Sequence, residues 1–341
     1  MEIDINLRCK LESAFEGKII RIMEGNSGRV FLVENNFTVP KISAYKTCKK
    51  RSDHYTRLFL EEAEKWNTIY SRNIIPIYKI VEVDEVLYIC MRDASSTLED
   101  ILLTDVDSIT AYMITLQLLN GLMDMEDSGI LYHQDFNPPN ILIEDLGHRF
   151  NVHGEPLFLS ENKDPYPPSS IHNSHKYRIM ISDFAMSNYY VKDHEKGKRG
   201  GKYGYIAPEQ YPTGPKGFSP DKFALGVIVC MLFSGKHPNG HDSSDIFKLN
   251  SDTNCEMKNW TLHGERLVYV ENKVIKDLIC NLLSVQPNHR ISYRKCYKKV
   301  YGEFSRLDNI NAKIFSKYIE YFESYYSIKN TNRPKLLVEK I

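Results

Sequence analysis

The stretch His133-Gln134-Asp135-Phe136-Asn137-Pro138-Pro139-Asn140-Ile141-Leu142 decides how the whole sequence is interpreted. In it, Asp135 and Asn140 stand just before an apolar run that is typical of a strand. Transfer of a phosphoryl group needs a carboxylate that orients the attacking hydroxyl, and oxygen ligands that hold magnesium on the phosphates. One loop offers both. Taken alone, the segment also fits an ordinary turn, because aspartate, asparagine and proline are turn formers.

Two further segments add to this signal. Asp183 directly follows the apolar run Ile179-Met180-Ile181, and a carboxylate at the end of a buried strand is well placed to coordinate a metal ion. By itself it also fits a loop aspartate that caps the next turn. Farther on, Gly204-Tyr205-Ile206-Ala207-Pro208-Glu209 is followed by Asp221 at the start of an apolar stretch.

Together and in this order, these segments resemble the protein kinase family. Residues 133–140, 183–185 and 207–209 match the family's H-R-D-x-x-x-x-N, D-F-G and A-P-E motifs. Asp221 matches the aspartate with which a buried helix of the family begins, and Arg290 matches the arginine near the end of the family's domain. The resemblance covers residues 18 to about 300. It implies an α+β, bilobal protein kinase fold, with a small β-rich N-lobe and a larger, mainly helical C-lobe.

The length and the pattern of the chain fit this organisation. With 341 residues and a soft prior of about 150 residues per domain, two folding units are expected. We predict an N-terminal extension (1–17), an N-lobe (18–94), a C-lobe (95–302) and a C-terminal helical tail (303–341). Residues 144–178 are polar and contain several prolines, so we predict an insertion there. Helical periodicity is clearest at 58–70, 109–129, 222–234, 274–284 and 310–326.

Composition excludes several classes of protein. Lysine plus arginine equals aspartate plus glutamate at 44 each, so nothing in the charge indicates a nucleic-acid or membrane-surface partner. No apolar run approaches the roughly 20 residues that cross a bilayer, and the first residues lack the pattern of a secretory signal. The seven cysteines are scattered and form no C-x-x-C pair, which fits free thiols in the cytosol and a cytoplasmic protein. The expected partner is a protein substrate.

The resemblance implies roles for individual residues. Asp135 is expected to orient the substrate hydroxyl, and Asn140 and Asp183 to hold Mg2+. Lys41 is expected to contact the phosphates of ATP and to pair with Glu62, although Glu61 and Glu64 compete for that place. The residues expected around the nucleotide are Gly25, Gly28, Val30, Lys41, Glu62, the gatekeeper Met91, and Arg92, Asp93 and Ala94 of the hinge.

Several positions depart from the family pattern. Gln134 replaces the arginine that in many kinases grips a phosphorylated activation loop, Met23 stands at the first loop glycine, and Ala185 replaces the glycine of D-F-G. Asn137 stands where serine/threonine kinases carry a lysine, and Lys202 where they carry a threonine. One hypothesis is that the charge has moved across this contact, which makes Lys202 catalytic. The alternative is a solvated Lys202.

The resulting hypothesis is an ATP- and Mg-dependent protein kinase that phosphorylates serine or threonine. A nucleotide-binding pseudokinase acting as a scaffold is the alternative, favoured by the altered glycine loop, Ala185 and Asn137. A small-molecule kinase is disfavoured by the intact A-P-E motif and Asp221. Within the family, the sequences of residues 96–98, 180–184 and 204–209 resemble those of the unfolded-protein-response kinase/endoribonuclease branch. About forty residues follow Tyr301, too few for a ribonuclease domain, so RNA cleavage is not expected.

Overall fold

A computed structural model describes residues 3–24, 28–35, 41–48, 53–94, 96–145, 177–184, 201–248, 254–328, 336 and 338–340. The chain forms two compact units. The smaller contains Met1–Tyr70, Ile75–Ala94 and Ile328–Ile341, and the larger contains Ser71–Ile74 and Ser95–Ser327. Gly25, Ala185 and most of the predicted insertion at 144–178 lie outside the described residues.

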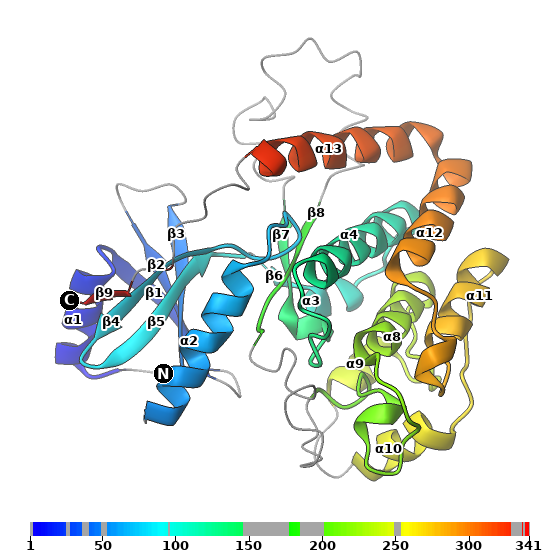
Figure 1. Ribbon diagram of the computed structural model, residues 1–341, viewed down its shortest axis with the longest axis horizontal. Coiled ribbons are helices and arrows are strands. Elements are labelled where there is room, and N and C mark those ends of the chain that lie inside the picture. Colours follow the sequence, from blue (N-terminus) through cyan, green and yellow to red (C-terminus); the bar gives the residue numbers. More distant parts are fainter. Residues whose placement is uncertain are drawn as a thin grey trace. The chain divides into compact units, whose positions relative to one another are not determined.

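The smaller unit is built on a six-stranded sheet in the order β1-β2-β3-β5-β4-β9 (Figure 1). Its strands are β1 (Lys18–Glu24), β2 (Gly28–Glu34), β3 (Ile42–Cys48), β4 (Ile77–Val83), β5 (Val86–Arg92) and β9 (Val338–Lys340). The first five pair antiparallel, and β9 joins the edge of β4 in parallel. Short connections between β1, β2 and β3 explain why consecutive strands are neighbours, since antiparallel strands need only a tight turn.

One helix packs on each face of this sheet (Figure 1). Helix α1 (Ile5–Ala14) covers one face and α2 (Asp53–Asn67) the other. Side chains alternate between the faces along each strand, so two separate cores form. The core under α1 contains Leu11, Phe15, Phe31, Tyr45 and Tyr88, and the core under α2 contains Phe59, Ala63, Ile80, Leu87 and Ile89. The predicted extension 1–17 is therefore part of the packed smaller unit.

The larger unit is mainly helical. Its helices are α3 (Leu98–Leu102), α4 (Ser108–Asp127), α8 (Pro220–Ser234), α9 (Ser243–Phe247), α10 (Asn254–His263), α11 (Lys273–Leu282), α12 (Tyr293–Leu307) and α13 (Asn309–Ile328). Helix α4 packs against α8, α12 and β8. A short antiparallel sheet pairs β6 (Ser96–Thr97), β7 (Ile141–Asp145) and β8 (Tyr177–Ile181). Among the described residues, no helix is both long and apolar enough to cross a membrane.

The C-terminal segment differs from the predicted helical tail. Helix α13 ends at Ile328, and the chain then adds β9 to the sheet of the smaller unit, with Val338 opposite Ile80. The Lys79 ammonium lies 2.8 Å from the Glu339 carboxylate. An edge strand such as β4 presents unpaired main-chain groups, and a short strand can satisfy them without any helical periodicity in its sequence. The helix predicted at 310–326 corresponds to α13, whereas the strand β9 was not predicted.

Candidate active site

The loop of residues 133–140, here called the Asp135 loop, is held in place by hydrogen bonds to helix α8. Asp221, in the first turn of α8, accepts hydrogen bonds from the backbone N–H groups of His133 (2.6 Å) and Gln134 (2.8 Å). Burial raises the pKa of Asp221 to about 7, and the two backbone hydrogen bonds oppose this rise. The His133 ring also lies 2.9 Å from the Ser182 carbonyl oxygen. The loop is thus attached both to α8 and to the end of β8.

The Asp135 carboxylate is held by two side-chain amides of its own loop. Asn137 donates through Nδ2 to Oδ1 of Asp135 (2.5 Å), and Asn140 donates through Nδ2 to Oδ2 (2.9 Å). Both amides also donate to the Asp135 carbonyl oxygen. Burial raises the pKa of Asp135 to about 6, and the nearby charge of Asp183 acts in the same direction. The carboxylate is therefore oriented and mainly ionised at neutral pH. Its raised pKa is near the value that suits a general base.

Asp183 and Asn140 supply the oxygen groups beside this carboxylate. The backbone N–H and the hydroxyl of Ser182 each donate to the Asn140 carbonyl oxygen at 2.9 Å, which joins the end of β8 to the Asp135 loop. Asp183 has φ +65, a left-handed conformation that is uncommon for a residue other than glycine. Because Asn140 donates through Nδ2, its Oδ1 is the atom left to face a cation. A carboxylate and an amide oxygen are ligands that Mg2+ accepts, so the donor set fits this ion.

In the smaller unit, a buried ion pair joins β3 to α2, and it does not involve Lys41. Lys46 Nζ lies 2.9 Å from Glu62 Oε1, and the two side chains are 9% and 6% exposed. Lys41 precedes β3, its side chain is 70% exposed, and it pairs with Glu34. The predicted Lys41–Glu62 pair is wrong, because β3 begins only at Ile42. Glu62, rather than Glu61, is the acid of α2 that contacts the strand lysine.

Other residues predicted around the nucleotide lie on the same sheet. Val30 of β2 is opposite Lys46 of β3 in the antiparallel register, so their side chains share one face. Gly28 begins β2, and Met91 is buried in β5. Arg92 ends β5, and Asp93 and Ala94 follow it, each partly exposed. Gly25 cannot be placed among them, since it lies outside the described residues.

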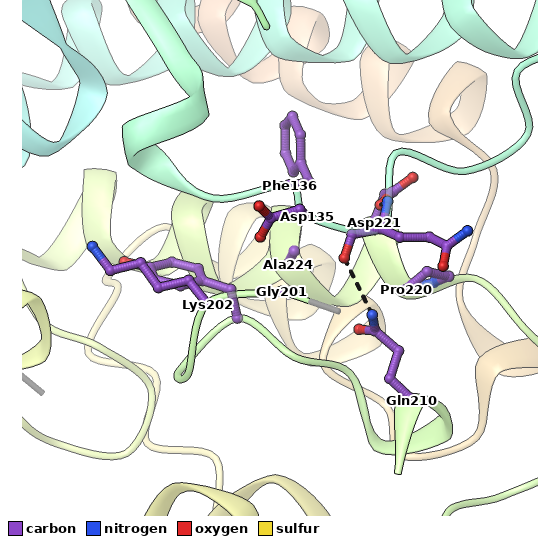
Figure 2. Close-up of a pocket in the computed structure, with 10 residues that line it drawn as sticks. Asp135, Phe136, Gly201, Lys202, Gln210, Pro220, Asp221 and Ala224 are labelled. Carbon is purple, nitrogen blue, oxygen red and sulfur yellow. Dashed lines mark hydrogen bonds between the residues drawn. The ribbon is translucent and has the colours of Figure 1, made fainter. Parts of the chain in front are cut away.

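Lys202 lies beside the Asp135 loop, but its ammonium group does not. The Lys202 Nζ is 2.8 Å from Glu99 Oε2 and 5.3 Å from the centroid of the Phe247 ring. Figure 2 shows the Lys202 side chain extending away from Asp135. The predicted position of the ammonium is therefore wrong in this structure, because Glu99 provides a carboxylate closer to the end of the side chain.

The A-P-E segment is tied to the rest of the larger unit by a fully buried ion pair. Arg290 donates to both Glu209 oxygens, at 2.6 and 2.8 Å, and neither side chain is exposed. Gln210 Nε2 donates to the Gln134 carbonyl oxygen (3.2 Å), the dashed line in Figure 2. A small pocket lies between this segment and the Asp135 loop, lined by residues that include Asp135, Gly201, Lys202 and Ala224.

The protein kinase domain family matches residues 18–302, and the chain belongs to this family. The match confirms the predicted fold of a β-sheet lobe and a helical lobe. It includes every site residue described above.

Several relatives of low sequence identity carry the names of protein kinases. Myosin light chain kinase 2 of rat (skeletal/cardiac muscle) is 25% identical over 280 residues, which are 80% of this chain and 40% of the relative. A probable serine/threonine-protein kinase of Dictyostelium discoideum is 26% identical over 290 residues, 79% of this chain and 60% of the relative. Calcium-dependent protein kinase 5 of Plasmodium falciparum is 23% identical over 333 residues, 96% and 52% of the two chains.

The chain thus spans about two fifths of the length of the muscle kinase. None of these three relatives is of the unfolded-protein-response branch, and the comparisons do not support that narrower likeness.

Proposed function

We propose that this protein transfers the γ-phosphoryl group of ATP to serine or threonine hydroxyls of a protein substrate. The observation that carries the proposal is the Asp135 carboxylate, held between the amides of Asn137 and Asn140. A scaffold that has lost turnover has no chemical need for this arrangement. The preference for serine and threonine is supported by the relative from Dictyostelium discoideum, a probable serine/threonine-protein kinase.

In the proposed reaction, each residue has a separate task. Asp135 accepts a hydrogen bond from the attacking hydroxyl and takes up its proton. Asn140 and Asp183 hold Mg2+, which neutralises charge on the phosphate oxygens when bound. Lys46, in place of the predicted Lys41, contacts the phosphates, and its pairing with Glu62 fixes the ammonium position on β3. The backbone after β5, at Asp93 and Ala94, remains the proposed contact of the adenine.

The test combines phosphoryl transfer with nucleotide binding. Purified protein is incubated with ATP labelled at the γ-phosphate, Mg2+ and a generic protein acceptor, and nucleotide binding is measured separately by titration. We expect Asp135→Asn to keep binding and to lose transfer by at least about a hundredfold, roughly 2.7 kcal/mol. Asp127→Asn is the matched control, because Asp127 lies on the exposed end of α4 in the same unit.

Each outcome discriminates between the candidate functions. Wild-type protein that binds nucleotide without transferring phosphate would favour the pseudokinase alternative. An Asp135→Asn variant that loses binding and transfer together would show that the Asp135 loop is structural.

A further inference from the structure

Residues 201–206, here called the 201–206 segment, lie directly beside the Asp135 carboxylate. Gly201 and Tyr205 line the same pocket as Asp135. A Cβ atom at Gly201 would lie 3.8 Å from Asp135 Oδ1 and 3.3 Å from Cγ1 of Ile206. In the proposed reaction a hydroxyl of the acceptor protein reaches Asp135, so the acceptor also contacts this segment. The position of the segment therefore decides how well an acceptor fits.

The middle of the segment is held by a buried histidine that follows helix α8. His237 Nε2 lies 3.0 Å from the carbonyl oxygen of Gly204, and the histidine is completely buried. A carbonyl oxygen can only accept a hydrogen bond, so Nε2 carries a proton and donates it. Gly204 has φ +92, and a Cβ there would lie 3.6 Å from this nitrogen and 3.4 Å from Cγ2 of Ile246. The backbone of Gly204 thus packs closely against the ring that holds it.

The His237 ring is itself fixed on its other sides. Its second nitrogen, Nδ1, lies 2.8 Å from Oδ1 of Asn239 and accepts from the backbone N–H of the same residue at 3.2 Å. The ring centroid lies 4.7 Å from that of Trp260 in α10. Arg266 covers the indole ring at 4.5 Å and donates to the Trp260 carbonyl oxygen. His237 therefore gives the Gly204 carbonyl a partner with a defined position.

We propose that His237 is a positioning residue for the protein acceptor, because its Nε2–H holds the Gly204 carbonyl and thereby keeps the 201–206 segment in place beside Asp135. It acts through the segment and is not among the residues that line the pocket. This inference rests on the proposed function. Gly204 is buried, so without the histidine its carbonyl loses its partner away from water, and the segment shifts to satisfy it. An acceptor that must reorder the segment binds more weakly.

The first arm of the test measures steady-state kinetics with casein as the acceptor. The amide nitrogen of glutamine can take the place of histidine Nε2, whereas that of the shorter asparagine cannot reach Gly204. We expect His237→Asn to raise KM for casein about tenfold, roughly 1.4 kcal/mol of binding, with KM for ATP unchanged. His237→Gln should restore KM for casein to within about threefold of the wild type. A merely structural loss of active protein would instead lower kcat and leave both KM values unchanged.

His241→Asn is the matched control. His241 follows in the same loop, but its ring is half exposed and lies 3.5 Å from Glu256 of α10. Because this contact does not reach the 201–206 segment, KM for casein should not change. An equal rise in both asparagine variants would overturn the proposal.

The second arm measures hydrogen exchange, which requires no activity. The Tyr205 amide donates to the Lys202 carbonyl oxygen at 3.0 Å, and Leu118 is completely buried in α4. In His237→Asn, exchange at Tyr205 should become about tenfold faster or more, while exchange at Leu118 stays the same. Unchanged exchange at Tyr205, or an equal increase at Leu118, overturns the positioning of the segment by His237.

A measurement on the wild type covers the case in which His237→Asn does not fold. The ¹⁵N chemical shifts of histidine-labelled protein should show a proton on Nε2 of His237, and an unprotonated Nε2 overturns the proposal. If the wild type transfers no phosphate, the proposed function fails, while the exchange and ¹⁵N measurements still test whether His237 holds the segment. Faster exchange at Tyr205 with an unchanged KM for casein in an active enzyme overturns the role in acceptor binding.

Discussion

Replacing Arg290 by methionine tests what the buried A-P-E ion pair contributes to stability. Arg290 and Glu209 are both completely buried, and they make two hydrogen bonds at 2.6 and 2.8 Å. Arg290 also donates to the carbonyl oxygens of Ser219 and Ser284. Methionine fills much of the same volume but leaves the Glu209 carboxylate buried without its cation. The larger unit should therefore lose stability chiefly through an uncompensated charge.

The expected magnitude follows from burial, and a neighbouring pair provides the comparison. Removing one partner of a buried ion pair costs about 3–5 kcal/mol, while an exposed pair contributes about 0.2–1 kcal/mol. Arg294 also makes two hydrogen bonds to a carboxylate, from Nη2 to both oxygens of Asp127 at 2.8 Å each, but these side chains are 62% and 57% exposed. Arg294→Met should thus cost less than about 1 kcal/mol. The two pairs differ chiefly in burial, although Arg290 uses two guanidinium nitrogens and Arg294 only one.

The assay is urea unfolding followed by fluorescence of Trp260, the tryptophan of the larger unit. The change in free energy of unfolding is obtained from the midpoint and the slope m of each transition. Arg290→Met with Glu209→Leu should recover part of the loss, because no buried charge remains unpaired. Equal destabilisation by Arg290→Met and Arg294→Met would refute the reasoning, since burial would then have no influence.

Three further predictions concern other sites. Burial lowers the pKa of His237 to about 4, so below pH 6.5 the unfolded chain takes up a proton at this histidine while the folded protein does not. The free energy of unfolding should therefore fall by about 2 kcal/mol from pH 7 to pH 5. In urea unfolding, His237→Gln should remove that part of the pH dependence. Lys46→Met should lower kcat/KM for ATP about a hundredfold, and Lys41→Met should lower it less than about twofold. The reverse order in steady-state kinetics would show that Lys41, and not Lys46, contacts the phosphates. Asp183→Asn should weaken nucleotide binding at least about tenfold in the presence of Mg2+ but not in its absence, and equal titration curves for variant and wild type with Mg2+ would exclude Asp183 as a metal ligand.

The Asp135 loop could be predicted from the sequence because its chemistry is local. Asp135, Asn137 and Asn140 lie within six consecutive residues, and their mutual hydrogen bonds follow from one turn of chain. The long helices α4, α8 and α11 were predicted for the same reason, since their periodicity is contained in each segment.

The strand lysine was misplaced although the sequence contains a signal for it. Pro40 precedes Lys41, and proline is unfavourable in a central strand because it lacks the N–H that pairs with the next strand. Ala44, Tyr45 and Lys46 instead alternate between the two faces of β3. Tyr45 is buried in the core under α1, and Lys46 contacts Glu62 on the opposite face. The alternation of side chains along β3 therefore indicates that Lys46 is the strand lysine that faces Glu62.

The partner of Lys202 could not be predicted in this way. Glu99 is 103 residues away in the sequence, and only the packing of α3 on the Asp135 loop brings the two together. The strand β9 could not be predicted either, because three exposed residues carry no periodicity that distinguishes a strand.

The pairing of β9 with β4 also bears on how the protein is made. Lys79 and Glu339 are 260 residues apart, so at a synthesis rate of 5–20 residues per second β4 waits about 13–50 seconds for its neighbour. During this interval the larger unit is completed while one edge of the smaller sheet stays open. Lys79 and Glu82 place charges along that edge, and both later pair with β9. Charged side chains on an open edge discourage pairing with other chains, so the groups that receive the last strand also protect the nascent protein from aggregation.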